Sequence, residues 1–86
     1  MGMRYGVVVQ SSDLVISTWL VAPTSTRRPH ASYRPEITLD GARTRVLVEQ
    51  TTVMDPEIRL GEFVGRLDPH EMRAIDDALR VVLGLD

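Results

Sequence analysis

One segment near the carboxyl end, residues 69–83, is patterned as an amphipathic helix, and it limits the folds open to the rest of the chain. Asp68 precedes it as an N-cap, Pro69 takes the first helical position, and Glu71 completes a capping box. Gly84 follows as the expected helix terminator. Apolar residues recur at helical spacing along one side of the segment: Met72, Ile75, Leu79, Val82 and Leu83. No other segment of this length has the same periodicity, so the remaining core must come from β-structure.

Turn-forming residues divide the rest of the chain into short β-branched or alternating runs. The predicted strands span residues 7–9, 16–22, 35–39, 43–50 and 63–67. Asp40-Gly41 is a strong hairpin signal between the third and fourth of them, and a single helical turn is predicted at 55–61. In the fourth strand, alternation places Val46 and Val48 on one face and Arg45, Leu47 and Glu49 on the other. The order predicts a mainly β, α+β fold, a small antiparallel barrel closed by its C-terminal helix.

The size and composition of the chain exclude several classes of protein. Its 86 residues form one domain, 1–86. The chain contains no cysteine, which excludes disulfides and cysteine-based zinc sites and favours a reducing, cytoplasmic setting. No apolar run is long enough to span a bilayer. The net charge is −2, so indiscriminate binding of polyanions is not expected, although residues 1–50 hold six arginines against four acidic residues.

A group of hydroxyl and guanidinium side chains follows the second predicted strand. Thr24, Ser25, Thr26, Arg27 and Arg28 come directly after Pro23. Hydroxyls donate hydrogen bonds to phosphate oxygens, and an arginine fork matches them bidentately. The group therefore indicates an anion site, with a nucleic-acid backbone as one candidate ligand. The alternative is a polar turn that ends a strand, because proline, serine and threonine are common there for local reasons.

Glu49 is the acidic residue that could add acid–base chemistry to this group. It ends an apolar strand, so it can be a partly buried general base, or it can pair with Arg43 or Arg45. His30 and His70 are predicted to be exposed, and the sequence has no cluster that could bind a metal, so neither a metal nor a cofactor is expected. Arginine, hydroxyl and carboxylate together can cleave RNA without metal, because the 2′-hydroxyl itself can attack the adjacent phosphorus.

Several segments, in their order and spacing, resemble the MazF/PemK (Kid) toxins of bacterial toxin–antitoxin systems. The matching segments are residues 7–10, 21–26, 45–50, 55, 59–61, 64–67 and 76–85. The resemblance implies an SH3-like barrel of the CcdB/MazF type with a C-terminal helix. It also implies a homodimeric mRNA interferase that cuts single-stranded RNA without metal, leaving a 2′,3′-cyclic phosphate and a 5′-hydroxyl. A MazE-like antitoxin would inhibit it.

The resemblance also suggests roles for individual residues. Arg4 matches a catalytic arginine before the first valine run, with Tyr5 in place of the usual proline. Counting from Ala22-Pro23, Ser25 falls at the position of the catalytic hydroxyl, and a slip of one residue would put Thr24 or Thr26 there. Glu49 falls at the position of the carboxylate base in Kid-like members. Thr24, Thr26, Arg27, Arg28 and Gln50 are then expected to bind RNA.

The start of the chain departs from the family pattern. The family begins with a strand that carries an Arg-Gly-Glu/Asp motif and a long loop over the RNA groove, and this chain starts near the end of that loop. A barrel without its usual first strand is expected, with impaired activity. Two alternatives follow: a catalytically weak or inactive homologue that dimerises and binds an antitoxin, and a gyrase poison of the CcdB type. The C-terminus lacks the Trp-Gly-Ile-type ending of the latter.

Overall fold

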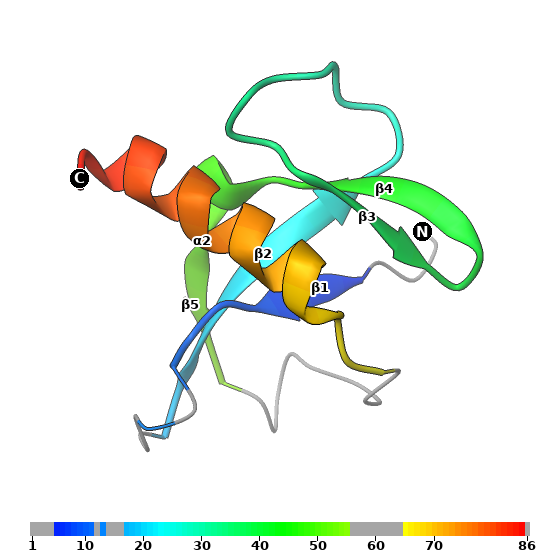
Figure 1. Cartoon of the computed structure of the whole chain (residues 1–86). Coiled ribbons are helices and arrows are strands. Elements are labelled where there is room, and N and C mark those ends of the chain that lie inside the picture. Colours follow the sequence, from blue (N-terminus) through cyan, green and yellow to red (C-terminus); the bar gives the residue numbers. More distant parts are fainter. Residues whose placement is uncertain (1–4, 12, 14–16, 56–64, 86) are drawn as a thin grey trace.

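A computed structural model describes residues 5–11, 13, 17–55 and 65–85 of the chain. In this part, a curled antiparallel sheet forms a half-barrel, and one long helix lies across it (Figure 1). The strands are β1 (Gly6–Val8), β2 (Trp19–Ser25), β3 (Glu36–Leu39), β4 (Ala42–Val46) and β5 (Thr52–Met54). A 3-10 turn, η1 (Val48–Gln50), separates β4 from β5, and the helix is α2 (Pro69–Leu83). The predicted class, a mainly β fold with a C-terminal helix, is confirmed.

Strand β2 is the centre of the sheet because three other strands pair with it. Its Val21 pairs with Val8 of β1 on one side and with Thr52 of β5 on the other. Near its end, β2 pairs with β4 through Thr24 and Ser25, and β3 pairs in turn with β4. The strand end that carries the hydroxyl residues is therefore held against β4, and its backbone position is fixed.

Residues 42–54 form two separate strands, β4 and β5, which both pair with β2. A single strand was predicted over 43–50. Strand β4 ends at Val46, and the backbone turns through η1 before β5 resumes the pairing. Leu47 lies between them and donates its N–H to the carbonyl of Pro23 at 2.8 Å. Val46, Leu47 and Val48 are all buried, and the backbone leaves the extended conformation of β4 at Leu47, directly before η1, so residues 43–50 do not form one strand. The prediction of one continuous strand is wrong for this reason.

The other strand predictions differ from the structure in their boundaries. Strand β2 ends at Ser25, three residues later than predicted, and β5 was not predicted at all. Pro23 is tolerated inside β2 although it has no N–H. The predicted helical turn at 55–61 lies almost wholly outside the described residues, as does the start of the predicted strand at 63–67. Residues 65–67, the described part of that strand, are not in a strand.

Helix α2 has the predicted boundaries, and its first turn is capped as the sequence indicates. The Asp68 carboxylate accepts the N–H of Glu71 at 2.8 Å, and Glu71 Oε1 accepts the N–H of Asp68 at 3.1 Å. Gly84 ends the helix with a φ of 70°, in the left-handed region that favours glycine. These contacts satisfy backbone groups that would otherwise lack partners at the two ends of the helix.

The helix packs its middle turns on the sheet to form the core. Ile75 and Ala78 are buried in one cluster with side chains from the strands and η1, which are Val7, Ala22, Ile37, Val46 and Val48. Met72 and Leu79 are partly buried against this cluster. Val82 and Leu83, which were predicted to be core residues, are 38% and 63% exposed, because the last turn of the helix extends beyond the sheet. In the described residues, no helix has the length and apolarity to cross a bilayer.

Candidate functional site

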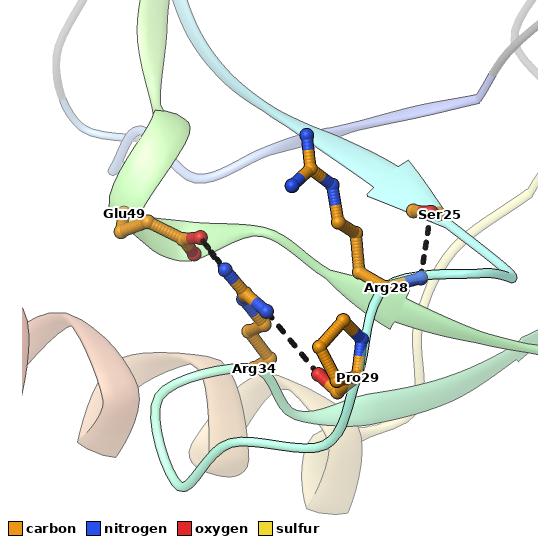
Figure 2. A network of polar contacts seen from close by, with 5 residues as sticks. All are labelled: Ser25, Arg28, Pro29, Arg34 and Glu49. Carbon is orange, nitrogen blue, oxygen red and sulfur yellow. Dashed lines mark hydrogen bonds and ion pairs between the residues drawn. The ribbon is translucent and has the colours of Figure 1, made fainter.

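Ser25 ends β2 and organises the turn that follows it, residues 25–29, which we call the 25–29 turn. Its Oγ accepts the backbone N–H of Arg27 at 3.1 Å and that of Arg28 at 3.2 Å. Figure 2 shows the second of these bonds at the tip of β2. Both interactions use Ser25 as an acceptor, so its own hydroxyl hydrogen remains for donation to a ligand. Ser25 can therefore hold the turn, as expected for a polar turn residue, and also donate a hydrogen bond to a phosphate.

Thr24 has a different role, which separates it from its neighbours. Its Oγ1 donates to the carbonyl of Tyr5 at 2.8 Å, and its backbone N–H donates to the same carbonyl at 3.2 Å. The Tyr5 hydroxyl in turn bonds Asp40 at 3.3 Å. The Thr24 hydroxyl hydrogen is thus committed to holding the chain just before β1. Thr26 is exposed, and no hydrogen bond of its hydroxyl occurs among the described residues.

Arg27 and Arg28 are exposed and extend from the 25–29 turn. In the described part of the chain, neither guanidinium makes a hydrogen bond or an ion pair. Figure 2 shows the Arg28 side chain extending away from Pro29. Two unneutralised cations beside a hydroxyl donor form an arrangement that attracts phosphate.

Glu49 lies on η1 and forms an ion pair with Arg34, not with either of the partners considered from the sequence. Its Oε2 accepts from Nε of Arg34 at 2.9 Å and from Nη2 at 2.7 Å. Partial burial raises the pKa of the Glu49 carboxyl, but the bonds from Arg34 and from the backbone outweigh it, and the pKa lies below its usual value. Arg45 instead pairs with Glu36 at 3.3 Å. Glu49 is therefore ionised at neutral pH, although its basicity is reduced.

Arg34 is the residue of this region that the sequence did not single out. It lies in the loop between β2 and β3, and its side chain is only 13% exposed. Besides Glu49 it contacts the Pro29 carbonyl, to which Nη1 donates at 3.2 Å, and the ring of Tyr33, whose centroid is 5.3 Å from its Cζ. Nothing in the local pattern distinguishes this arginine from the other arginines, because its partners are distant in sequence.

A continuous series of contacts joins the predicted residues on β2 and η1. Ser25 bonds the backbone of Arg28, whose neighbour Pro29 accepts from Arg34, which binds Glu49 (Figure 2). The structure thus brings a hydroxyl donor, exposed guanidiniums and an ionised carboxylate into one region. Gln50 is exposed at the end of η1. Arg4 lies outside the described residues.

The described residues show no other constellation that could carry chemistry. His30 and His70 are exposed, as expected. No group of three or more histidine or acidic side chains in the described part of the chain is arranged to hold a metal ion. In the described part of the chain, the curled sheet, the helix α2 and the basic strand end together define a small half-barrel protein with an exposed cationic turn.

Comparisons with known proteins identify the family to which this fold and strand end belong. Residues 1–83 match the model for the PemK-like, MazF-like toxin of type II toxin–antitoxin systems. A Mycobacterium tuberculosis protein named "Putative toxin Rv3098A/RVBD_3098A" is 36% identical over 84 residues, which cover 98% of this chain and 79% of that protein. The chain therefore belongs to the PemK/MazF toxin family, and the resemblance found in the sequence is confirmed.

The fold is also that of a solved toxin. The Mycobacterium tuberculosis toxin MazF-mt6 superimposes with a TM-score of 0.84 over 96% of this chain and 88% of that one. Sequence identity between the two is 18%, so the likeness establishes the fold alone. The half-barrel with a C-terminal helix is the architecture of this family, as predicted.

Proposed function

We propose that this family member is a toxin endoribonuclease that cleaves single-stranded mRNA without a metal ion. The observation that carries the proposal is the end of β2, where Ser25 retains a hydroxyl hydrogen for donation and Arg27 and Arg28 are exposed beside it. Guanidiniums and hydroxyls placed around one phosphate stabilise the charge that develops on its oxygens during cleavage. Membership of the toxin family supports this reading.

The reaction we propose uses the RNA 2′-hydroxyl as the nucleophile. Glu49 accepts the 2′-hydroxyl proton, the 2′-oxygen bonds to phosphorus, and the bond from phosphorus to the 5′-oxygen breaks. The products are a 2′,3′-cyclic phosphate and a 5′-hydroxyl, the latter formed when the leaving oxygen takes up a proton. Ser25 donates to a phosphate oxygen, and Arg4, assigned from the resemblance, stabilises charge or transfers the proton. Thr24, Thr26, Arg27, Arg28 and Gln50 complete the RNA-binding surface.

The partners we propose are a second copy of the chain and an antitoxin that binds the same region, in the cytoplasm. Exposed apolar side chains support self-association, because monomeric proteins rarely expose many of them together. On β2 and β5 these include Trp19 and Val53, and in the last turn of α2 and just after it they include Val81, Leu83 and Leu85. An acidic antitoxin segment would complement the exposed Arg27 and Arg28.

The experiment that tests the proposal is cleavage of single-stranded RNA by the purified protein in the presence of EDTA. We expect 2′,3′-cyclic phosphate ends, and we expect no cut where the attacking nucleotide is 2′-deoxy. Arg4→Ala and Ser25→Ala should each slow cleavage strongly, whereas Arg80→Gln, a change at an exposed position of α2, should not. Equal rates for Arg4→Ala, Ser25→Ala and the parent would refute the site assignment.

One observation favours a second candidate, a non-catalytic protein that dimerises and binds an antitoxin. Glu49 is held by two hydrogen bonds from Arg34, and an ion-paired carboxylate with a lowered pKa is a weaker base. Expression in cells separates the two candidates. Growth arrest supports the nuclease, and tight binding of an antitoxin without arrest supports the binding protein.

A further inference from the structure

Side chains form hydrogen bonds both to N–H groups and to carbonyl groups of the backbone in the 25–29 turn. The N–H groups of Arg27 and Arg28 bond Ser25 Oγ. The next two carbonyls along the chain accept from guanidiniums, because Arg45 Nη1 donates to the Arg28 carbonyl at 3.2 Å and Arg34 Nη1 donates to the Pro29 carbonyl at 3.2 Å. A loop with so many fixed backbone groups has few conformations to lose when a ligand binds.

The two arginines are themselves anchored to carboxylates on neighbouring elements. Arg34 binds Glu49 of η1 through two nitrogen atoms, at 2.9 and 2.7 Å, and Arg45 of β4 pairs with Glu36, its cross-strand neighbour on β3, at 3.3 Å. Their side chains are 13% and 22% exposed. Each guanidinium therefore connects a loop carbonyl to a fixed acid in the fold.

These contacts distinguish Arg34 and Arg45 from the two arginines of the turn itself. The donors of Arg34 are directed to Glu49 and Pro29, and its charge is matched by the carboxylate. Arg27 and Arg28 are exposed and make no ion pair within the described residues. Arg34 and Arg45 are therefore arranged to hold the turn, whereas Arg27 and Arg28 are arranged to bind an external anion.

We propose that Arg34 and Arg45 are positioning residues that hold the 25–29 turn in the form that presents Arg27 and Arg28 to RNA phosphates. The inference rests on the proposed RNA-binding function. Losing either guanidinium leaves one carbonyl of the turn without its partner and allows the loop more conformations. RNA binding then has to order the loop, which weakens affinity without removing any contact to the RNA.

The dependence of binding on salt is the test of this distinction. The dissociation constant of an uncleavable single-stranded 2′-deoxy oligonucleotide is measured over a range of salt concentrations for the parent and for each variant. Arg27→Gln or Arg28→Gln should weaken binding. Each should also lower the slope of the logarithm of the dissociation constant against the logarithm of the salt concentration by about 0.7 for each lost phosphate contact. Arg34→Gln and Arg45→Gln should raise the dissociation constant about three- to tenfold and leave the slope unchanged. Arg80→Gln, which removes the same charge from the helix surface, should change neither quantity.

Amide hydrogen exchange tests the positioning role independently of RNA. The amides of Arg27 and Arg28 should exchange faster in Arg34→Gln and in Arg45→Gln than in the parent, and at the parent rate in Arg80→Gln. Arg34→Lys and Arg45→Lys, which keep the charge, serve if a glutamine variant fails to fold. They should also increase exchange, because an ammonium cannot reproduce the planar fork.

The outcomes separate this proposal from the proposed function. A reduced salt slope in Arg34→Gln or Arg45→Gln would identify that residue as a phosphate ligand and overturn the positioning role. Unchanged exchange of both amides would overturn it as well. If the parent binds no RNA but the amides respond as expected, the proposed function fails while the positioning of the turn stands.

Discussion

The side chain of Glu71 in the first turn of α2 bonds the backbone N–H of Thr38 on β3 at 3.0 Å through its Oε2. Its other oxygen, Oε1, completes the capping box with Asp68. One carboxylate thus closes the helix start and also covers a donor on β3, which pairs only with β4 among the described strands. Edge donors left uncovered favour pairing with other chains, and Glu71 covers this one while it caps the helix.

Glu71→Ala should destabilise the fold by about 1–2 kcal/mol, because it removes a cap and leaves the Thr38 N–H without its partner. For a domain of this size, each kcal/mol lowers Tm by about 4–8 °C. Thermal unfolding followed by circular dichroism measures the change. Glu71→Gln, which keeps an oxygen acceptor, should recover part of the loss, and an equal Tm for Glu71→Ala and the parent would contradict the double role.

The three hydroxyls at the end of β2 should differ in their effect on cleavage. Ser25→Ala removes the donor and the acceptor of the 25–29 turn, so kcat should fall by about 10²–10³. Thr26→Ala should have a smaller effect that is mainly on KM. Thr24→Val should lower stability through the lost bond to Tyr5 while leaving kcat of the folded protein near that of the parent. Single-turnover cleavage together with melting curves separates these outcomes, and a larger kcat loss for Thr24→Val than for Ser25→Ala would reverse the assignment.

The ion pair between Glu49 and Arg34 should make stability depend on pH in the acid range. The folded pKa of Glu49 is below its unfolded value of 4.5. Its contribution to stability is therefore complete above that value and is lost as pH falls through the folded pKa. Melting temperatures from about pH 7 to about pH 3 should fall more steeply for the parent than for Glu49→Gln, which is less stable at neutral pH. Parallel curves would show that the pair contributes nothing to folding.

Gly6 permits a close approach between β1 and β2. A Cβ at this position would lie 2.7 Å from Cγ1 of Val21, which is 1% exposed and therefore has little room to move. Gly6→Ala should cost about 1–3 kcal/mol through this overlap, as measured by chemical denaturation. Gly41→Ala is a useful comparison, because a Cβ there meets nothing within 4 Å and any cost comes from its φ of 78° alone. A Gly6→Ala variant as stable as the parent would show that β1 can shift away from β2.

Features governed by neighbouring residues were predictable from the sequence, and features governed by distant partners were not. The capping box at Asp68 and the hairpin at Asp40-Gly41 are local patterns, and both occur as predicted. Strand β5 depends on pairing with β2, more than thirty residues away, and its short Thr52–Met54 segment has no distinctive pattern.

The same difference between neighbouring residues and distant partners decides which parts of the candidate site could be predicted. Ser25, Arg27 and Arg28 adjoin one another in sequence, so their grouping could be predicted, and the structure keeps them together in the 25–29 turn. The partner of Glu49 could not be predicted, because Arg34 reaches it from a loop whose path the local sequence does not determine. The roles of these residues in catalysis remain predictions for the experiments above.

The arginines that hold the backbone of the 25–29 turn lie outside that turn, which has a consequence for protein engineering. Arg34 and Arg45 bind backbone carbonyls, and carbonyls are the same whatever side chains residues 28 and 29 carry. Exposed residues 26–28 can therefore be exchanged while their support is retained, in the way that variable loops are exchanged on a fixed scaffold. A library randomised at these three positions would vary the surface offered to the proposed RNA ligand at little cost to folding.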